Sequence, residues 1–247
     1  MIGQITLTGM VLNAANVGEY DKRISILTKE RGKITAFSKG SRRQNSSLLA
    51  CSQPFSFGTF VLYEGRSSYT LVSAEISNYF MELRDDFEKV SYGMYFLEFV
   101  DYYTKENSDE KEVLKLLYQS CRALISDTIS NELVKCIFEL KMFAINGEIT
   151  PLRECAACGA RDNLKGISVD AGAAVCECCT ETIRDTMIVS KSTLYTMQYV
   201  IYSSIEKLYS FVVTDEVLVE FNRFLKRYIN KYIDKKFKTL DMLVAFK

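Results

Sequence analysis

The sequence has no histidine, only two prolines and no long apolar run. Without histidine the commonest general base is missing, and an ordinary zinc hydrolase is disfavoured. With prolines only at Pro54 and Pro151, a long proline-rich linker is not expected. No stretch of about 18 apolar residues predicts a membrane span, and the polar residues after Met1 do not predict a signal peptide. We therefore expect a cytoplasmic protein whose thiols stay reduced.

The formal net charge is zero, but charge is unevenly distributed along the chain. Residues 1–80 carry nine Lys/Arg and five Asp/Glu, residues 81–190 carry twelve and twenty, and residues 191–247 carry ten and six. A basic start, an acidic middle and a basic end predict separate surfaces for separate partners.

Residues 1–80 predict a five-stranded barrel. Short runs rich in β-branched and aromatic residues recur: "QITLTGMVL", "RISILT", "KITAFS", "FSFGTFVLY" and "SYTLVSA". Gly32 in "KERG" can supply the positive φ of a short hairpin. Five such strands closing on themselves predict an OB-fold, a barrel that often holds single-stranded nucleic acid. A small β-sandwich of unrelated function is the alternative.

From about residue 81 the pattern changes to that of helices. Asp85, Asp86 and Glu88 suit the positive end of a helix dipole. Apolar residues at helical spacing follow in residues 109–125, 131–147, 191–211 and 215–237; those of the first of these segments are Val113, Leu116, Leu117 and Leu124, with Ser120 on the same stripe. The predicted fold class is α+β multidomain: an OB-fold domain over 1–80 and a helical domain over 81–247, with a zinc-binding segment at about 150–185.

Five of the eight cysteines lie between Cys155 and Cys179. The outer four read Cys155-x2-Cys158, then 17 residues, then Cys176-x2-Cys179. Two thiolates on a tight turn can face one cation, and a second pair completes a tetrahedron with Zn–S distances of about 2.3 Å. The spacing fits the four-cysteine zinc template. We expect one structural zinc ion held by these four residues.

Other interpretations of the cysteines remain open. A thioredoxin-like redox pair lacks its surrounding βαβ unit, and an iron–sulfur cluster or a set of cysteines without metal are further alternatives. Cys178 can substitute for Cys179 as a ligand. Cys51, Cys121 and Cys136 lie in apolar or helical contexts, where a buried thiol in the core is expected.

Basic residues are concentrated near the start of the chain. Several fall on predicted turns and in the loop after the third strand, where long side chains can reach a phosphate backbone. The predicted DNA-binding residues are Lys22, Arg23, Lys29, Arg31, Lys33, Lys39, Arg42, Arg43 and Arg66. Exposed aromatic residues can stack on bases; the candidates are Phe37, Phe57, Phe60 and Tyr69. The alternatives are a solvated cationic surface and aromatic side chains in the core.

Four stretches together resemble the bacterial RecO family of recombination mediators over nearly the whole chain. They are "GEYDKRISILTKERGKITAFSKGSRR", "QPFSFGTFVLYEGRSSYTLVSAE", "LRDDFEKVSYGMYFLEFVD" and the cysteine segment from Cys155. Positions that look alike among family members include Gly18, Asp21, Lys22, Gly32, Lys33, Lys39, Gly40, Arg42 and Arg43. The neutral total charge departs from what a strong DNA binder would show.

The resemblance implies an N-terminal OB domain and a helical C-terminal domain that often carries zinc. It implies binding of single- and double-stranded DNA and annealing of complementary strands. With RecR, such a protein helps to load RecA onto DNA covered by single-strand binding protein (SSB) in the RecF pathway. A cytoplasmic, nucleoid-associated bacterial protein is implied.

The last helix offers a second basic surface. Its cations recur at spacings of three and four: Arg223, Lys226, Arg227, Lys231, Lys235 and Lys236. A solvated helix face is one interpretation, and a contact for DNA or for the acidic C-terminal tail of SSB is the other.

We expect a protein without catalytic activity. The sequence has no phosphate-binding GxxxxGK[ST] loop and no histidine base. Asp85 and Asp86 could hold Mg²⁺ in a nuclease, but a helix start explains them more simply. The alternative function is a zinc-stapled protein-interaction scaffold without direct DNA contact.

Overall fold

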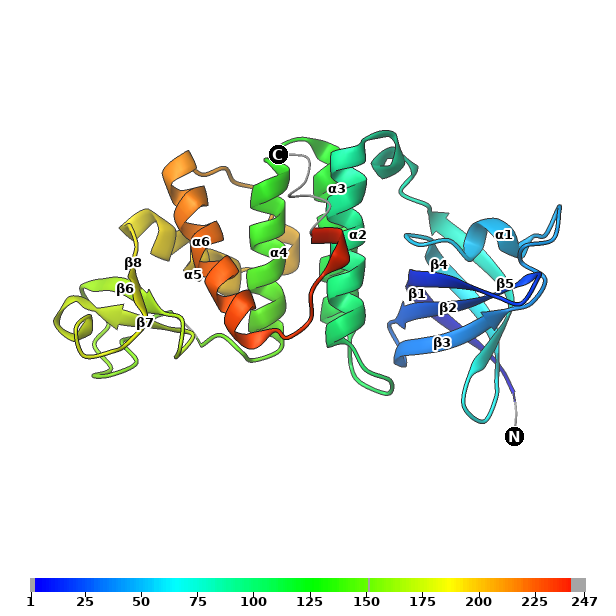
Figure 1. The fold of residues 1–247 in the computed structure, drawn as a ribbon, viewed down its shortest axis with the longest axis horizontal. Helices are drawn as coiled ribbons and strands as arrows, with labels where there is room; N and C mark the ends of the chain where they lie inside the picture. Colours follow the sequence, from blue (N-terminus) through cyan, green and yellow to red (C-terminus); the bar gives the residue numbers. More distant parts are fainter. Residues whose placement is uncertain (1–2, 151, 241–247) are drawn as a thin grey trace. The chain divides into compact units, whose positions relative to one another are not determined.

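The computed structural model describes residues 3–150 and 152–240, and it divides into two compact units (Figure 1). The first unit contains the described residues up to Ile125 and those from Phe237 onward. The second unit runs from Ser126 to Lys236.

The first unit begins with a closed barrel. Its strands are β1 (Gln4–Val17), β2 (Asp21–Thr28), β3 (Gly32–Ser38), β4 (Phe57–Glu64) and β5 (Tyr69–Asn78). They close in the order β1-β2-β3-β5-β4, with β3 and β5 parallel and the other neighbours antiparallel. A short helix, α1 (Leu48–Cys51), interrupts the loop between β3 and β4. This confirms the predicted five-stranded barrel of OB type.

Apolar side chains at alternate positions along the strands point inward and fill the barrel. Val11, Ile24 and Phe60 are fully buried in its core cluster, and a bulge between Val11 and Asn13 bends the long first strand. Of the four aromatic residues proposed for base stacking, Phe60 is therefore a core residue. The other three, Phe37, Phe57 and Tyr69, are half-buried.

Two helices complete the first unit: α2 (Phe87–Tyr103), preceded by the short turn η1 (Met81–Asp85), and α3 (Lys111–Ser126). The Asp86 carboxylate accepts hydrogen bonds from the backbone N–H groups of Glu88 and Lys89, at 2.9 and 3.1 Å. Asp86 thus caps the helix, and the predicted helix start explains its carboxylate. Every member of the predicted stripe on α3 is buried, which confirms that helix face.

The second unit contains α4 (Asn131–Ile145), α5 (Lys191–Tyr202) and α6 (Asp215–Tyr232) (Figure 1). Between α4 and α5 lies a cysteine-rich insert with β6 (Leu164–Ser168), β7 (Ala173–Cys176) and β8 (Thr186–Ile188), paired in the order β7-β6-β8. A short turn, η2 (Glu177–Cys179), follows β7. The sequence did not predict this sheet, because strands of three to five residues show no clear alternation.

Helix α5 ends at Tyr202, although the apolar pattern predicted a helix as far as residue 211. Ser203 and Ser204 are extended, and only the short turn η3 (Ile205–Lys207) follows. The buried Lys141 ammonium donates hydrogen bonds to the carbonyls of Ile201 and Ser203, both at 2.8 Å. Lys141 thereby satisfies groups that a helix end leaves without partners.

Candidate metal centre and nucleic-acid interface

The structure brings the four predicted metal ligands together. The sulfur atoms of Cys155, Cys158, Cys176 and Cys179 all lie within 4.8 Å of one another, and those of Cys158 and Cys176 are 3.6 Å apart. A tetrahedral zinc site with Zn–S bonds of about 2.3 Å places its sulfurs about 3.8 Å apart. The geometry therefore fits one tetrahedral ion. The Cys178 side chain is exposed and lies outside this group.

Backbone hydrogen bonds shape the turn that carries the first pair of thiols. The N–H of Cys155 donates to the Ala160 carbonyl at 2.8 Å, and the N–H of Gly159 donates to the Cys155 carbonyl at 2.9 Å. Gly159 has a φ of +72°, which glycine adopts without strain. The second pair lies at the end of β7 and on η2, and the N–H of Ala156 donates to Ala174 on β7.

The thiols differ in how readily they ionise. Burial opposes ionisation of Cys155, but backbone N–H groups of Cys176, Cys158 and Ala157 favour its thiolate and lower its pKa to about 6. Hydrogen bonds with the thiols of Cys176 and Cys158 raise the pKa of Cys179 to about 12. The Cys155 thiolate thus forms more readily than the Cys179 thiolate. A divalent cation at the centre supplies the positive charge that four thiolates require.

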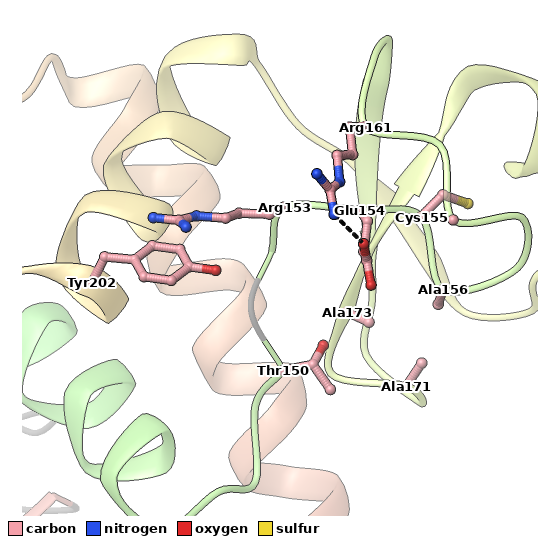
Figure 2. Close-up of a pocket in the computed structure, with 10 residues that line it drawn as sticks. Thr150, Arg153, Glu154, Cys155, Ala156, Arg161, Ala171, Ala173 and Tyr202 are labelled. Carbon is pink, nitrogen blue, oxygen red and sulfur yellow. Dashed lines mark ion pairs between the residues drawn. The ribbon is translucent and has the colours of Figure 1, made fainter.

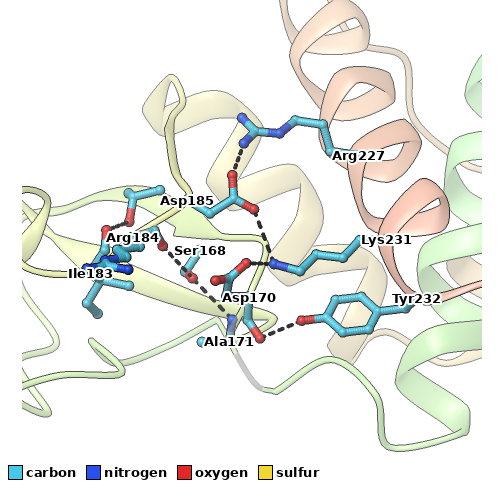
Figure 3. A network of polar contacts seen from close by, with 10 residues as sticks. Ser168, Asp170, Ala171, Ile183, Arg184, Asp185, Arg227, Lys231 and Tyr232 are labelled. Carbon is cyan, nitrogen blue, oxygen red and sulfur yellow. Dashed lines mark hydrogen bonds and ion pairs between the residues drawn. The ribbon is translucent and has the colours of Figure 1, made fainter.

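Ion pairs join the insert to α6 (Figure 3). Arg227 pairs with Asp185, and Lys231 pairs with Asp170 and, at 3.7 Å, with Asp185. The Tyr232 hydroxyl donates to the Asp170 carbonyl at 2.8 Å. Two of the α6 cations that the sequence offered as a binding surface are therefore engaged within the unit.

Replacing Asp185 by asparagine is expected to lower the free energy of unfolding only slightly, through a weaker contact between the insert and α6. The Asp185 side chain is 24% exposed and its partners Arg227 and Lys231 are 45% and 41% exposed, so screening keeps the loss to about 1 kcal/mol. A double-mutant cycle that combines Asp185→Asn with Arg227→Ala, followed by urea unfolding, measures the coupling energy between the two side chains. Coupling that persists unchanged in molar salt would contradict an electrostatic contact.

A hollow of about 890 Å³ lies beside the metal centre (Figure 2). The Arg153 guanidinium lies 3.4 Å from the ring centroid of Tyr202, and Arg161 pairs with Glu154 at 3.6 Å. Both arginines are thus already engaged, and the Glu154 carboxylate offsets part of their charge. The electrostatics of this hollow give little preference for an anion.

The predicted DNA-binding cations fall into separate groups on the barrel. Lys33 pairs with Asp101 of α2 at 3.3 Å, and Arg31 pairs with Glu64 at 3.7 Å. These two cations are partly neutralised. Lys29, in the β2–β3 turn, and Arg66, in the β4–β5 turn, are exposed.

The other five cations lie at one end of the barrel. We call this surface the basic tip. It consists of residues 18–23, which form the β1–β2 turn and the start of β2, and residues 39–43, which follow β3. Its cations are Lys22, Arg23, Lys39, Arg42 and Arg43. Lys22 is only 7% exposed, and burial, followed by the charge of Arg42, lowers its pKa. The other four are exposed, and within the described residues none of them pairs with a carboxylate.

Hydrogen bonds fix the two segments of the basic tip to each other. The backbone N–H of Arg42 donates to the Tyr20 carbonyl at 2.9 Å, and its guanidinium donates to the Gly18 carbonyl at 3.3 Å. The N–H of Gly40 donates to the Asp21 carboxylate at 2.7 Å. The cations are thus held on a braced surface before any ligand binds, which lowers the entropy cost of binding.

None of the helices described has both the length and the apolar character that crossing a bilayer requires. The fold and the candidate site together define the class of protein. It is a multidomain protein with an OB-type barrel that has a cationic end, followed by helices with a four-thiol candidate metal centre.

Comparison with known proteins identifies the family. Residues 1–80 match the model described as "Recombination protein O N terminal", and residues 84–241 match "Recombination protein O C terminal". The chain belongs to the RecO family, and its role lies in DNA repair and recombination.

Relatives match over almost their whole length. DNA repair protein RecO of Alkaliphilus metalliredigens is 32% identical over 240 residues, which covers 96% of this chain and 98% of that protein. The protein of the same name from Acetivibrio thermocellus is 28% identical over 238 residues, covering 96% and 94%. That from Bacillus pumilus is 28% identical over 224 residues, covering 91% and 87%.

Proposed function

We propose that this chain is a non-catalytic, DNA-binding recombination mediator whose basic tip holds the phosphate backbone of a strand. The observation that carries the proposal is the group of four exposed cations without carboxylate partners in the described residues. Each phosphate contact releases condensed counterions, so a local charge excess supports binding even though the total charge is zero.

The mediator role needs no bond chemistry. A strand neutralised on the basic tip repels its complement less, which speeds annealing. We further propose that the protein acts with RecR to load RecA onto SSB-coated single strands in the cytoplasm, in association with the nucleoid. Family membership supports this role.

We propose zinc as the metal of the four-thiol centre. Four thiolates in a tetrahedral arrangement are the ligand set of structural zinc, and a closed coordination sphere leaves no position for a substrate. Bound there, zinc would supply structural order to the insert.

The triple variant Lys39→Ala/Arg42→Ala/Arg43→Ala tests DNA binding at the basic tip. Removing three phosphate contacts is expected to lower the slope of log affinity against log salt by about 2 on single strands, and to weaken binding at low salt by at least about tenfold. Fluorescence anisotropy of labelled oligonucleotides over a salt series measures both quantities.

The matched control removes the same charge elsewhere on the barrel: Lys29→Ala/Arg31→Ala/Arg66→Ala. It is expected to keep most of the wild-type salt slope. Equal loss in both triple variants would indicate a diffuse electrostatic effect. Absent or salt-independent binding by the wild-type chain would favour the protein-interaction scaffold, and Mg²⁺-dependent cleavage of the oligonucleotide would contradict a non-catalytic role.

A further inference from the structure

Tyr20 was not among the aromatic residues that the sequence suggested for base stacking, yet it is the one exposed on the basic tip. Its side chain lies in the β1–β2 turn and is 42% exposed. The Arg43 guanidinium lies over its ring, 5.3 Å from the centroid. An exposed aromatic ring therefore lies beside Arg43, one of the cations that the proposed function assigns to phosphate binding.

Hydrogen bonds fix the backbone that carries the ring. The Tyr20 carbonyl accepts the hydrogen bond from the Arg42 N–H, and Asp21, the next residue, is bonded to Gly40. Arg43 adds a cation–π contact from the second segment of the tip. Within the described residues the Tyr20 hydroxyl makes no hydrogen bond, and the contact with Arg43 leaves the residue 42% exposed.

We propose that Tyr20 is a base-stacking residue that gives the basic tip a preference for unpaired nucleotides. This inference rests on the proposed function, because it needs a strand on the tip. Phosphates beside Arg42 and Lys39 would place a neighbouring base against the exposed part of the ring. Bases in a duplex are already stacked on one another, so a duplex gains only the phosphate contacts.

Exposure alone does not distinguish Tyr20, because Tyr63 on β4 is 48% exposed as well. Tyr63 lies opposite Gln4 on the neighbouring strand β1 and is followed by Glu64, which forms an ion pair with Arg31. No cation lies over its ring in the described residues. Tyr63 is thus a matched control: the same residue type with similar exposure on the same barrel, but outside the basic tip.

The test compares three labelled probes of about 15 nucleotides, close to the site size of one OB fold: oligo(dT), a strand of abasic residues and a duplex. Tyr20→Leu is expected to weaken binding of oligo(dT) by about tenfold, the scale of one base–aromatic stack. Binding of the abasic strand and of the duplex should change by less than about twofold, since only the base contact is lost. Tyr20→Phe keeps the aromatic ring and is expected to retain the preference for oligo(dT) over the abasic strand and the duplex.

Tyr63→Leu should leave all three affinities unchanged. The inference is overturned if Tyr20→Leu leaves the ratio of oligo(dT) to abasic affinity unaltered while its thermal melting matches the wild type. The triple variant Lys39→Ala/Arg42→Ala/Arg43→Ala separates this failure from a failure of the proposed function. If it weakens binding of all three probes, the phosphate site stands without Tyr20; if it weakens none, both ideas fall.

Discussion

Replacing Cys155 by serine is expected to abolish metal binding and to unfold the cysteine-rich insert. The insert has only short strands, and the core around Cys155, Val175 and Cys176 is small. Apolar side chains away from the thiols are also buried, Ile167, Val169 and Met187 among them, and they offset part of the entropy of ordering the segment. The proposed zinc would order the part of the insert around the thiols, since binding of structural zinc is worth about 10 kcal/mol.

Two measurements check this. Elemental analysis of the purified variant should find less than one tenth of the wild-type zinc, and hydrogen exchange should show lost protection in β6 and β7. Amides of the barrel should keep their protection, because they belong to the other compact unit. Cys178→Ser is the matched control and should keep the metal. Loss of metal from Cys178→Ser but not from Cys179→Ser would contradict the ligand set assigned here.

Loss of the metal should also change the ion pairs of α6. Asp170 and Asp185 belong to the insert, and they hold Lys231 and Arg227. When the insert unfolds, these cations lose their partners and become an exposed basic stripe on the helix. We therefore expect metal removal to increase the free positive charge on α6, although the four thiols of the candidate centre all belong to the insert.

Much of the fold could be predicted because it depends on local patterns. Alternation in the first 80 residues predicts the strands, and the stripe that includes Val113 and Leu124 predicts a buried face of α3. The two Cys-x2-Cys pairs predict that four thiols converge, since each pair is fixed by its own turn.

Which cations form ion pairs within the fold and which remain available could not be predicted, because the partners of the paired cations are remote in sequence. Lys33 meets Asp101 on a helix that follows the barrel, and Arg227 meets Asp185 across the second unit. No local pattern separates such cations from Arg42 and Arg43, which keep their charge available. Tyr20 was missed for the same reason, since only the hydrogen bonds between two loops place it among the cations.

Replacing Gly58 by alanine is expected to destabilise the barrel by about 3 kcal/mol. Gly58 lies on β4 beside a bulge in its pairing with β5. A Cβ atom there would lie 2.1 Å from the Glu75 carbonyl oxygen and 2.7 Å from the Ile76 Cα atom, both on the backbone. Backbone atoms of a closed barrel cannot move aside without breaking ladder hydrogen bonds.

Gly9 lies opposite Gly58 in the β1–β4 pairing, and it has a similar close approach on its other side, to β2. A Cβ atom at Gly9 would lie 2.2 Å from the Leu27 carbonyl oxygen on β2, so glycine is needed at Gly9 for the approach of β2 and at Gly58 for the approach of β5. Urea unfolding followed by circular dichroism measures the loss. Gly3→Ala is the control, because among the described residues beyond its chain neighbours no atom lies within 4 Å of its Cβ position, and it should change stability by less than about 0.5 kcal/mol. Equal stability of the two variants would mean that β4 and β5 can separate at the bulge without cost, and the close contact would then have no energetic role.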